Sequence, residues 1–209
     1  MSYNPYSIVD EFEKRISEWC GAPYGVAVES CTAAIFLSLQ YCKQINGSIG
    51  AIEIPKFTYP SVPASIIHCG GKVVFTDNEW YGNYELRPLS IWDAALRFKK
   101  DMYHGGFQCL SFHVKKHLKI GRGGMILTDN KEAYDWLRLA RFDGREPVPL
   151  LEQKEFNVLG WNMYMEPTQA SRGIQLFEVL RAKHPDGMPD LPVDEQGYSD
   201  LSKFPIFRQ

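Results

Sequence analysis

Short apolar segments alternate with longer segments of helical periodicity, and this alternation constrains the fold more than any other feature of the sequence. Apolar, β-compatible runs occupy residues 24–28, 51–54, 72–76, 90–92, 108–112 and 125–128. Helical spacing of apolar residues is found at 8–19, 33–42, 62–69, 131–141 and 167–180. Strands that alternate with helices pack as a mainly parallel sheet between two helical layers. We therefore expect an α/β fold, a three-layer sandwich.

Two stretches lack this periodicity. Residues 77–89 are rich in Tyr, Asn, Gly and Pro, so we expect them to be irregular. Residues 184–209 hold four prolines and little apolar repetition, which predicts an extended tail that either docks on the domain or stays free. The predicted organisation is one domain over residues 1–180 followed by a carboxy-terminal tail over 181–209.

Composition excludes several classes of partner. The chain has 23 Lys+Arg against 25 Asp+Glu, so no charge excess favours nucleic acid or an anionic membrane. Five cysteines are scattered without C-x-x-C pairs, which favours reduced thiols over a disulfide framework or a zinc site. The polar amino terminus is unlike a signal peptide, and no apolar run approaches the roughly 20 residues of a membrane span. We expect a cytoplasmic protein without a metal site.

Polar residues follow the predicted strands directly, where open α/β sheets bind their ligands. Ser30-Cys31-Thr32 opens a helix whose free N–H groups favour a phosphate, although the same residues suit an ordinary amino-terminal cap. Asp93 ends a strand, and a buried carboxylate there needs a cation or hydrogen-bond donors. A protonated ring nitrogen of a ligand or the nearby Arg97 would each satisfy it.

Lys115 and Lys116 form the most suggestive pair. A lysine beside a second cation and near apolar surface has a lowered pKa, which favours the neutral amine that a Schiff base requires. The ordinary alternative is a solvated loop. Tyr59 also follows a strand, and could stack on a planar ligand or pack in the core.

The segment CLSFHVKKHLKIGRGG, residues 109–124, resembles the lysine segment of the DegT/DnrJ/EryC1/StrS aminotransferases. These are fold-type I enzymes of the aspartate aminotransferase type that use pyridoxal 5'-phosphate (PLP) and mostly aminate keto sugars attached to nucleotides. Ser111 matches a residue that binds the PLP phosphate. Lys116, five residues later, matches the lysine that forms the Schiff base with PLP.

Other segments resemble the family in the same order. Ser30, Cys31 and Thr32 correspond to a phosphate-binding loop, with Thr32 at the family threonine and Cys31 in place of a glycine. Tyr59 matches the aromatic residue that stacks on the PLP ring. Asp93 matches the aspartate that holds the pyridinium nitrogen. The resemblance thus implies one PLP site at these strand ends.

Asn162 matches an asparagine that reaches the phosphate in the neighbouring subunit, which implies a homodimer. The chain also departs from the family pattern. Leu96 stands at a glutamine, Arg122 at a glutamate and Tyr164 at an arginine. A strand and helix are missing from residues 77–91, and the tail is much shorter than the family's small domain, so the pattern is that of a truncated large domain.

The implied reaction is transamination from an amino acid such as L-glutamate to a keto sugar, with Lys116 moving the proton and Asp93 keeping the ring nitrogen protonated. An alternative is a PLP-binding protein that is inactive or regulatory, which the short chain and Leu96 motivate. Dehydratase relatives replace the lysine with His, and His117 keeps that branch open. A last alternative is an α/β domain without a cofactor.

Overall fold

The first helix and strand form where the apolar pattern places them. In the computed structural model, which describes residues 4–208, α1 (Ser7–Cys20) buries Val9, Phe12 and Ile16 along one face. Gly21 ends this helix in the left-handed conformation, with φ of 80°. β1 (Tyr24–Val28) is buried over its last four residues, which explains its uninterrupted apolar run.

The other predicted helices and strands are confirmed, with boundaries shifted by a few residues. In chain order they are α2 (Cys31–Asn46), β2 (Ala51–Pro55), α3 (Ser61–His68), β3 (Lys72–Thr76), β5 (Ile91–Asp93), β6 (Phe107–Ser111), β7 (Gly124–Thr128), α4 (Lys131–Ala140) and α5 (Pro167–Lys183). α2 begins two residues earlier than predicted because Ser30 caps it, its hydroxyl accepting from Ala33 N at 3.1 Å. Asn130 caps α4, its side chain accepting from Ala133 N at 3.0 Å.

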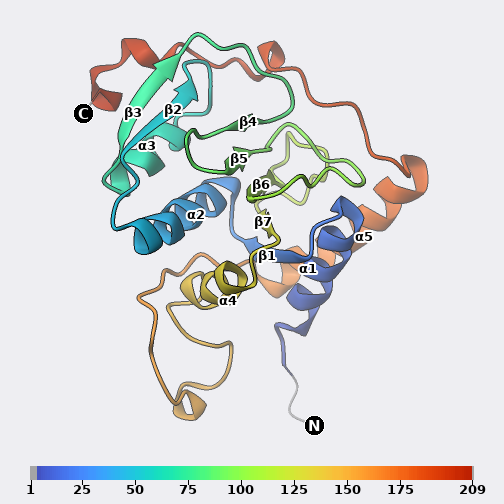
Figure 1. Ribbon diagram of the computed structural model, residues 1–209. Coiled ribbons are helices and arrows are strands. Elements are labelled where there is room, and N and C mark those ends of the chain that lie inside the picture. Colours follow the sequence, from blue (N-terminus) through green and yellow to red (C-terminus); the bar gives the residue numbers. More distant parts are fainter. Residues whose placement is uncertain (1–3, 209) are drawn as a thin grey trace.

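The strands lie between two layers of helices, as expected for a three-layer sandwich (Figure 1). One apolar core packs α2, α3 and α4 against the sheet, and the other packs α1 and α5 against its opposite face. The main sheet has the order β1-β7-β6-β5-β4, in which β4 is the short strand Tyr84–Glu85, and β2 and β3 pair in parallel beside it. β5 and β6 are parallel and β1 runs in the same direction, whereas β7 is antiparallel to β1 and β6.

Residues 77–89 are not wholly irregular, and that prediction is wrong for β4 (Tyr84–Glu85). β4 pairs antiparallel with β5, and the chain then continues to Arg87. Arg87 exchanges two backbone hydrogen bonds with Glu53 of β2, of 2.8 and 3.2 Å. This short segment therefore joins the two sheets edge to edge, by a pairing between residues far apart in the sequence that no local pattern reveals.

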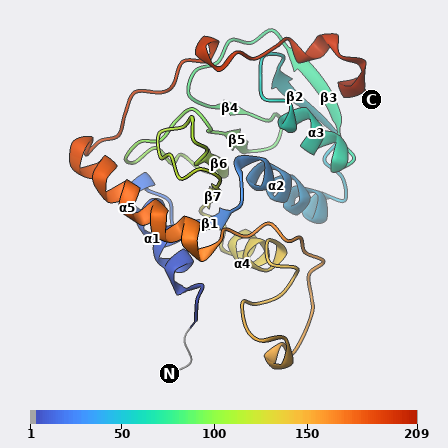
Figure 2. The same ribbon diagram turned by 180° about the vertical axis from the view of Figure 1, so that it is seen from behind.

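The tail docks, which was one of its two predicted behaviours. From the end of α5 it runs past β4 toward β2 and β3 (Figure 2). The Asp190 carboxylate, 1% exposed, forms ion pairs with Arg97 at 2.7 Å and Lys99 at 3.0 Å. Three 3-10 turns follow, at Asp194–Gln196, Leu201–Lys203 and Pro205–Phe207. The division into a domain and a tail at residue 180 stays a prediction.

No helix within the described residues combines the length and apolarity needed to cross a membrane. Within residues 4–208, no group of His, Cys, Asp and Glu side chains has the arrangement of a metal site. All five cysteines are free.

A buried ion pair connects α1, β1 and the end of α4. Glu13 of α1 is 4% exposed, and its carboxylate accepts from Ala27 N of β1 at 2.7 Å and from the Arg141 guanidinium. Arg141 also donates to the Ala27 carbonyl. Because both charged groups are removed from water, each depends on the other for compensation.

We expect Arg141→Met to lower the free energy of unfolding by about 3–5 kcal/mol, because it leaves Glu13 buried without its closest cation. Urea denaturation measures this loss. Arg122→Met is the matched control, since the Arg122 pair with Glu29 is exposed and such pairs contribute about 0–1 kcal/mol. Equal losses for the two variants would contradict the structural role of the buried pair.

Candidate active site

Most of the predicted site residues, but not Tyr59 and Asn162, converge where β1, β5 and β6 end. Asp93 is the last residue of β5 and is 5% exposed, and Ser111 is the last residue of the parallel neighbour β6. Cys31, the first residue of α2, places its sulfur 3.9 Å from Asp93 Oδ1 and 3.4 Å from the Cys109 carbonyl oxygen. Burial, and secondarily Asp93, raises the pKa of the Cys31 thiol, so it stays protonated and can donate.

The amino terminus of α2 forms a polar cradle. Ser30 is an ordinary cap, as one reading of the sequence predicted, but a cap leaves N–H groups of the first turn, at Cys31 and Thr32, available to an anion. Thr32 Oγ1 lies 2.8 Å from Ser61 Oγ at the start of α3, so two hydroxyls meet beside these amides. The cradle is thus compatible with both the capping role and the phosphate role of the turn.

Gly124 brings Ser111 next to this cradle. It pairs with Ser111 across β6 and β7, and a Cβ atom on Gly124 would lie 2.4 Å from the Ser30 carbonyl carbon. Only a residue without a side chain permits so close an approach of β7 to the turn. The phosphate-binding residues implied by the resemblance are therefore adjacent around the start of α2.

Lys116 extends from the loop after β6 and is half-buried. Its Nζ donates to Gln196 Oε1 at 3.1 Å. Burial lowers the pKa of Lys116; the opposite charge of Asp93 counteracts this, and Lys115 adds a smaller lowering effect. The lowered pKa agrees with the prediction from the sequence, and of the two predicted causes burial is the main one and the neighbouring Lys115 the smaller.

Asp93 is the buried counterpart of this amine. Its Oδ1 accepts from Ala95 N at 3.0 Å, and its Oδ2 accepts from the Tyr84 hydroxyl at 3.2 Å. Burial raises the pKa of Asp93, whereas Ala95, Tyr84 and Lys116 counteract that rise. A carboxylate has about four acceptor positions, so these contacts leave capacity for a further N–H donor.

The two remaining predicted residues are more peripheral. Tyr59 follows β2 and is 58% exposed. Burial, and secondarily the charge of Asp93, raises the pKa of Tyr198. Asn162 lies outside the cluster: it is exposed, and its amide donates to Asp143 at 3.1 Å.

The other residues that the sequence singles out make their contacts outside the cluster around Asp93 and Lys116. Arg97 binds Asp190, so it is not the cation that compensates Asp93. The His117 ring is buried and donates from Nε2 to the Pro189 carbonyl at 2.9 Å. Leu96, which the resemblance places at a family glutamine, is fully buried, and Arg122 pairs with Glu29 at 2.6 Å.

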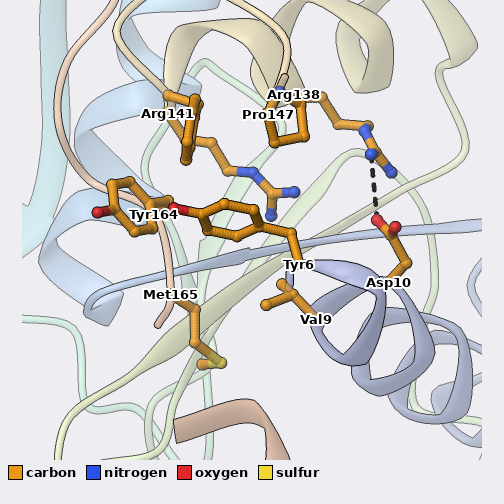
Figure 3. Close-up of a pocket in the computed structure, with 9 residues that line it drawn as sticks. Tyr6, Val9, Asp10, Arg138, Arg141, Pro147, Tyr164 and Met165 are labelled. Carbon is orange, nitrogen blue, oxygen red and sulfur yellow. Dashed lines mark ion pairs between the residues drawn. The ribbon is translucent and has the colours of Figure 1, made fainter. Parts of the chain in front are cut away.

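Figure 3 shows a separate pocket between α1, the end of α4 and the residues around Tyr164. Arg138 and Asp10 form an ion pair of 3.1 Å at its rim. Its cavity of about 10 Å³ has room for roughly one water molecule. A cofactor or sugar would not fit in a cavity of this size.

Sequence reasoning missed several residues of the site. Tyr84 lies in the aperiodic stretch, where it bridges Asp93 and the Thr58 hydroxyl. Gln196 and Tyr198 lie in the tail, whose composition gave no sign of a contact with Lys116. Ser61 was detectable in principle, because it follows the strand end at β2 as Ser30 follows β1.

Comparison with known sequences identifies one family. The profile described as the DegT/DnrJ/EryC1/StrS aminotransferase family matches residues 2–94 and 99–183. The chain is 26% identical to the spore coat polysaccharide biosynthesis protein SpsC of Bacillus subtilis, over 88% of this chain and 54% of that protein. It is also 26% identical to GDP-perosamine synthase of Caulobacter vibrioides, over 80% of this chain and 56% of that enzyme.

Solved structures show the same fold. The sugar aminotransferase CalS13 of Micromonospora echinospora superposes with a TM-score of 0.72 and 19% identity, covering 82% of this chain and 60% of that one. Helicobacter pylori PseC, an aminotransferase of pseudoaminic acid biosynthesis, gives 0.68 and 15%, covering 88% and 64%. The chain therefore spans about half the length of the curated relatives and about three fifths of these structures.

We expect Asp93→Asn to stabilise the chain at neutral pH. Burial raises the pKa of Asp93 above its ordinary 3.8, so the folded state binds its proton more readily than the unfolded state. The contribution of Asp93 to stability is complete below pH about 3.8 and is lost as the pH rises through the raised pKa. Asn does not titrate, so its advantage should grow from about pH 4 to 8.

Urea denaturation across this pH range measures the difference. Asp186→Asn is the matched control, because Asp186 is exposed and loses the same charge. A constant difference between wild type and Asp93→Asn at all pH values would contradict the assignment of a buried, destabilising carboxylate.

Proposed function

Because this chain belongs to the DegT/DnrJ/EryC1/StrS aminotransferase family, we propose that it is a PLP-dependent aminotransferase whose active site is the cluster around Lys116 and Asp93. The amino donor is an amino acid such as L-glutamate, and the acceptor is a keto sugar carried on a nucleotide. One observation carries the proposal: a half-buried amine with a lowered pKa and a buried carboxylate influence each other across neighbouring strand ends.

The donor set of this cluster fits PLP. A phosphate requires N–H and hydroxyl donors, which the start of α2, Thr32, Ser61 and Ser111 supply. A protonated pyridine nitrogen requires a carboxylate, and Asp93 has acceptor capacity left. The aldehyde requires a neutral amine, which the lowered pKa of Lys116 favours.

Each protein group has a defined task in transamination. When bound, PLP withdraws electrons from the substrate carbon that carries the amino group. Asp93 holds a proton on the ring nitrogen, and Tyr84 and Ala95 N stabilise the ionised carboxylate for this task. Lys116 accepts and returns a proton, and its lowered pKa favours the neutral amine that this requires.

The substrate class is supported by the names of the relatives. GDP-perosamine synthase is named for a nucleotide-linked amino sugar, and PseC acts in the biosynthesis of another sugar. Since the chain covers 54–56% of these curated relatives, its activity, donor and acceptor are all part of the proposal. Five free cysteines support a reducing compartment, and we place the protein in the cytoplasm.

We also propose that the chain acts as a homodimer, with Asn162 completing the partner's phosphate site. Asn162 is exposed and follows directly after the loop over residues 145–160, which protrudes from the domain (Figure 1). That loop exposes four large apolar side chains: Leu150 64%, Leu151 102%, Phe156 63% and Leu159 92%. Several exposed apolar side chains in one loop favour a protein partner, and a second copy bound at this loop would place Asn162 at the shared boundary.

Covalent capture of PLP tests the site. We expect borohydride reduction of the PLP-treated protein, followed by peptide mass spectrometry, to locate the label on Lys116. Lys116→Arg should lower labelling by about 100-fold or more, because the guanidinium stays protonated. Lys115→Arg is the control and should label within about twofold of wild type. Labelling of Lys115 instead would refute the assignment.

Donor turnover separates the enzyme from a protein that only binds PLP. We expect loss of the PLP absorbance band on adding L-glutamate, with release of the keto acid. Asp93→Asn should still be labelled but should slow this step about 100-fold or more. A wild-type protein that is labelled on Lys116 but never consumes any amino donor would support the inactive alternative.

Mixing two defective variants tests the shared site. Asn162→Ala and Lys116→Arg homodimers should each bind PLP poorly, whereas a mixed dimer restores one complete site from Lys116 of one protomer and Asn162 of the other. We expect labelling to recover to about a quarter of the wild-type level in statistical equimolar mixtures of exchanging protomers, because half of the dimers are mixed and each of these has one complete site of two. No recovery in mixtures shown to exchange, or a monomer with full PLP affinity, would overturn the homodimer proposal.

A further inference from the structure

A segment of the tail, residues 189–201 and here named the strap, crosses the candidate site and is fixed on its upstream side. Asp190 forms its buried ion pairs with Arg97 and Lys99, and Leu191 N donates to the Leu96 carbonyl at 2.9 Å. Gly82 leaves the space for Asp190, since a Cβ atom there would lie 2.2 Å from its Oδ2. The strap therefore begins firmly attached beside the end of β5.

The strap is fixed on its downstream side beside the end of β2. Leu201 is 3% exposed, and its backbone N–H donates to the Lys56 carbonyl at 2.9 Å. Asp200 forms an isolated antiparallel bridge with Phe57. Since both ends are attached to the residues that follow β5 and β2, the intervening turn stays over the strand ends that carry the site.

The middle of the strap presents an oriented acceptor to Lys116. The Gln196 amide nitrogen donates to the Pro192 carbonyl at 3.1 Å, so its oxygen is the atom that faces Lys116 Nζ. Tyr198 stacks on Trp80 with ring centroids 6.1 Å apart, and Trp80 donates to the Phe57 carbonyl at 2.9 Å. These contacts fix the strap on both sides of Gln196.

We propose that Gln196 is a positioning residue for Lys116 and that the strap forms one wall of the cofactor site. The inference rests on the proposed function and deepens it. A neutral amine has two N–H donors and one lone pair, and an amide oxygen can only accept. By accepting an N–H, Gln196 directs the lone pair away from the strap and toward the site, where the carbonyl of PLP would bind.

Because Gln196 is uncharged, it does not itself favour the ammonium form of Lys116, and the charged groups around the amine decide its protonation state. Asp93 from β5 and Cys31 from α2 face the amine, and Lys115 and His117 flank it in its own loop. Glu at position 196 would add a negative charge at hydrogen-bonding distance and favour the ammonium form. That change would move the pH at which Lys116 becomes reactive, which loss of packing alone would not do.

The experiment measures the rate of PLP capture against pH for wild type, Gln196→Glu and Gln196→Ala. We expect Gln196→Glu to shift the profile upward by about one pH unit or more, the effect of an opposite charge in contact. Gln196→Ala should slow capture about three- to tenfold with little pH shift, because orientation is lost and no charge is added. Glu195→Gln, an exposed side chain in the same turn, should leave both rate and profile unchanged.

The outcomes distinguish this inference from the proposed function. A wild-type protein that captures no PLP on Lys116 overturns the proposed function. Capture on Lys116 with an unshifted Gln196→Glu profile overturns the inference alone, provided that thermal melting shows the variant to be folded. A shifted profile with an unchanged Glu195→Gln control supports the strap as part of the site.

Discussion

The burial of the Asp93 carboxylate is the constraint on which the arrangement of the site depends. An ionised group at 5% exposure is unfavourable unless donors and a cation compensate it. Its compensation comes from Ala95 N after β5, the Tyr84 hydroxyl of β4 and the amine of Lys116 after β6. Three segments must therefore assemble around the Asp93 side chain. The carboxylate that they hold in place is the group that a protonated ring nitrogen would bind.

The short β4 segment links this site to the sheet. Tyr84 reaches Asp93, and three residues later Arg87 pairs with Glu53 of β2. Residues 84–87 thus connect β5 to the β2–β3 pair. This one segment therefore has two tasks: Arg87 joins the two sheets, and Tyr84 donates a hydrogen bond to the buried carboxylate of Asp93.

The strap reaches the same site from the other end of the chain. Its attachment depends on a buried charge, Asp190, that is paired with two cations, while Gln196 presents an uncharged acceptor to Lys116. The charged group of the strap, Asp190, is paired with cations, and the group that contacts Lys116 is a neutral amide. This agrees with the lowered pKa of Lys116, since a carboxylate in contact with the amine would counteract the effect of burial. Within the strap, Asp190 thus contributes to attachment, whereas Gln196 contributes to the reactivity of Lys116.

The sequence by itself determined the elements and the strand ends. Apolar periodicity is a local property of one helix or strand, so α1, β1 and β3 lie where it predicted, and the strand-end rule placed Asp93, Ser111 and Lys116 together. Only the tertiary structure decided which donors compensate Asp93, that Glu13 pairs with Arg141 and that Gln196 meets Lys116. These contacts join residues that are distant in the chain or lie in aperiodic segments. No local pattern encodes them, because they form only when packed layers bring separate segments into one low-dielectric environment.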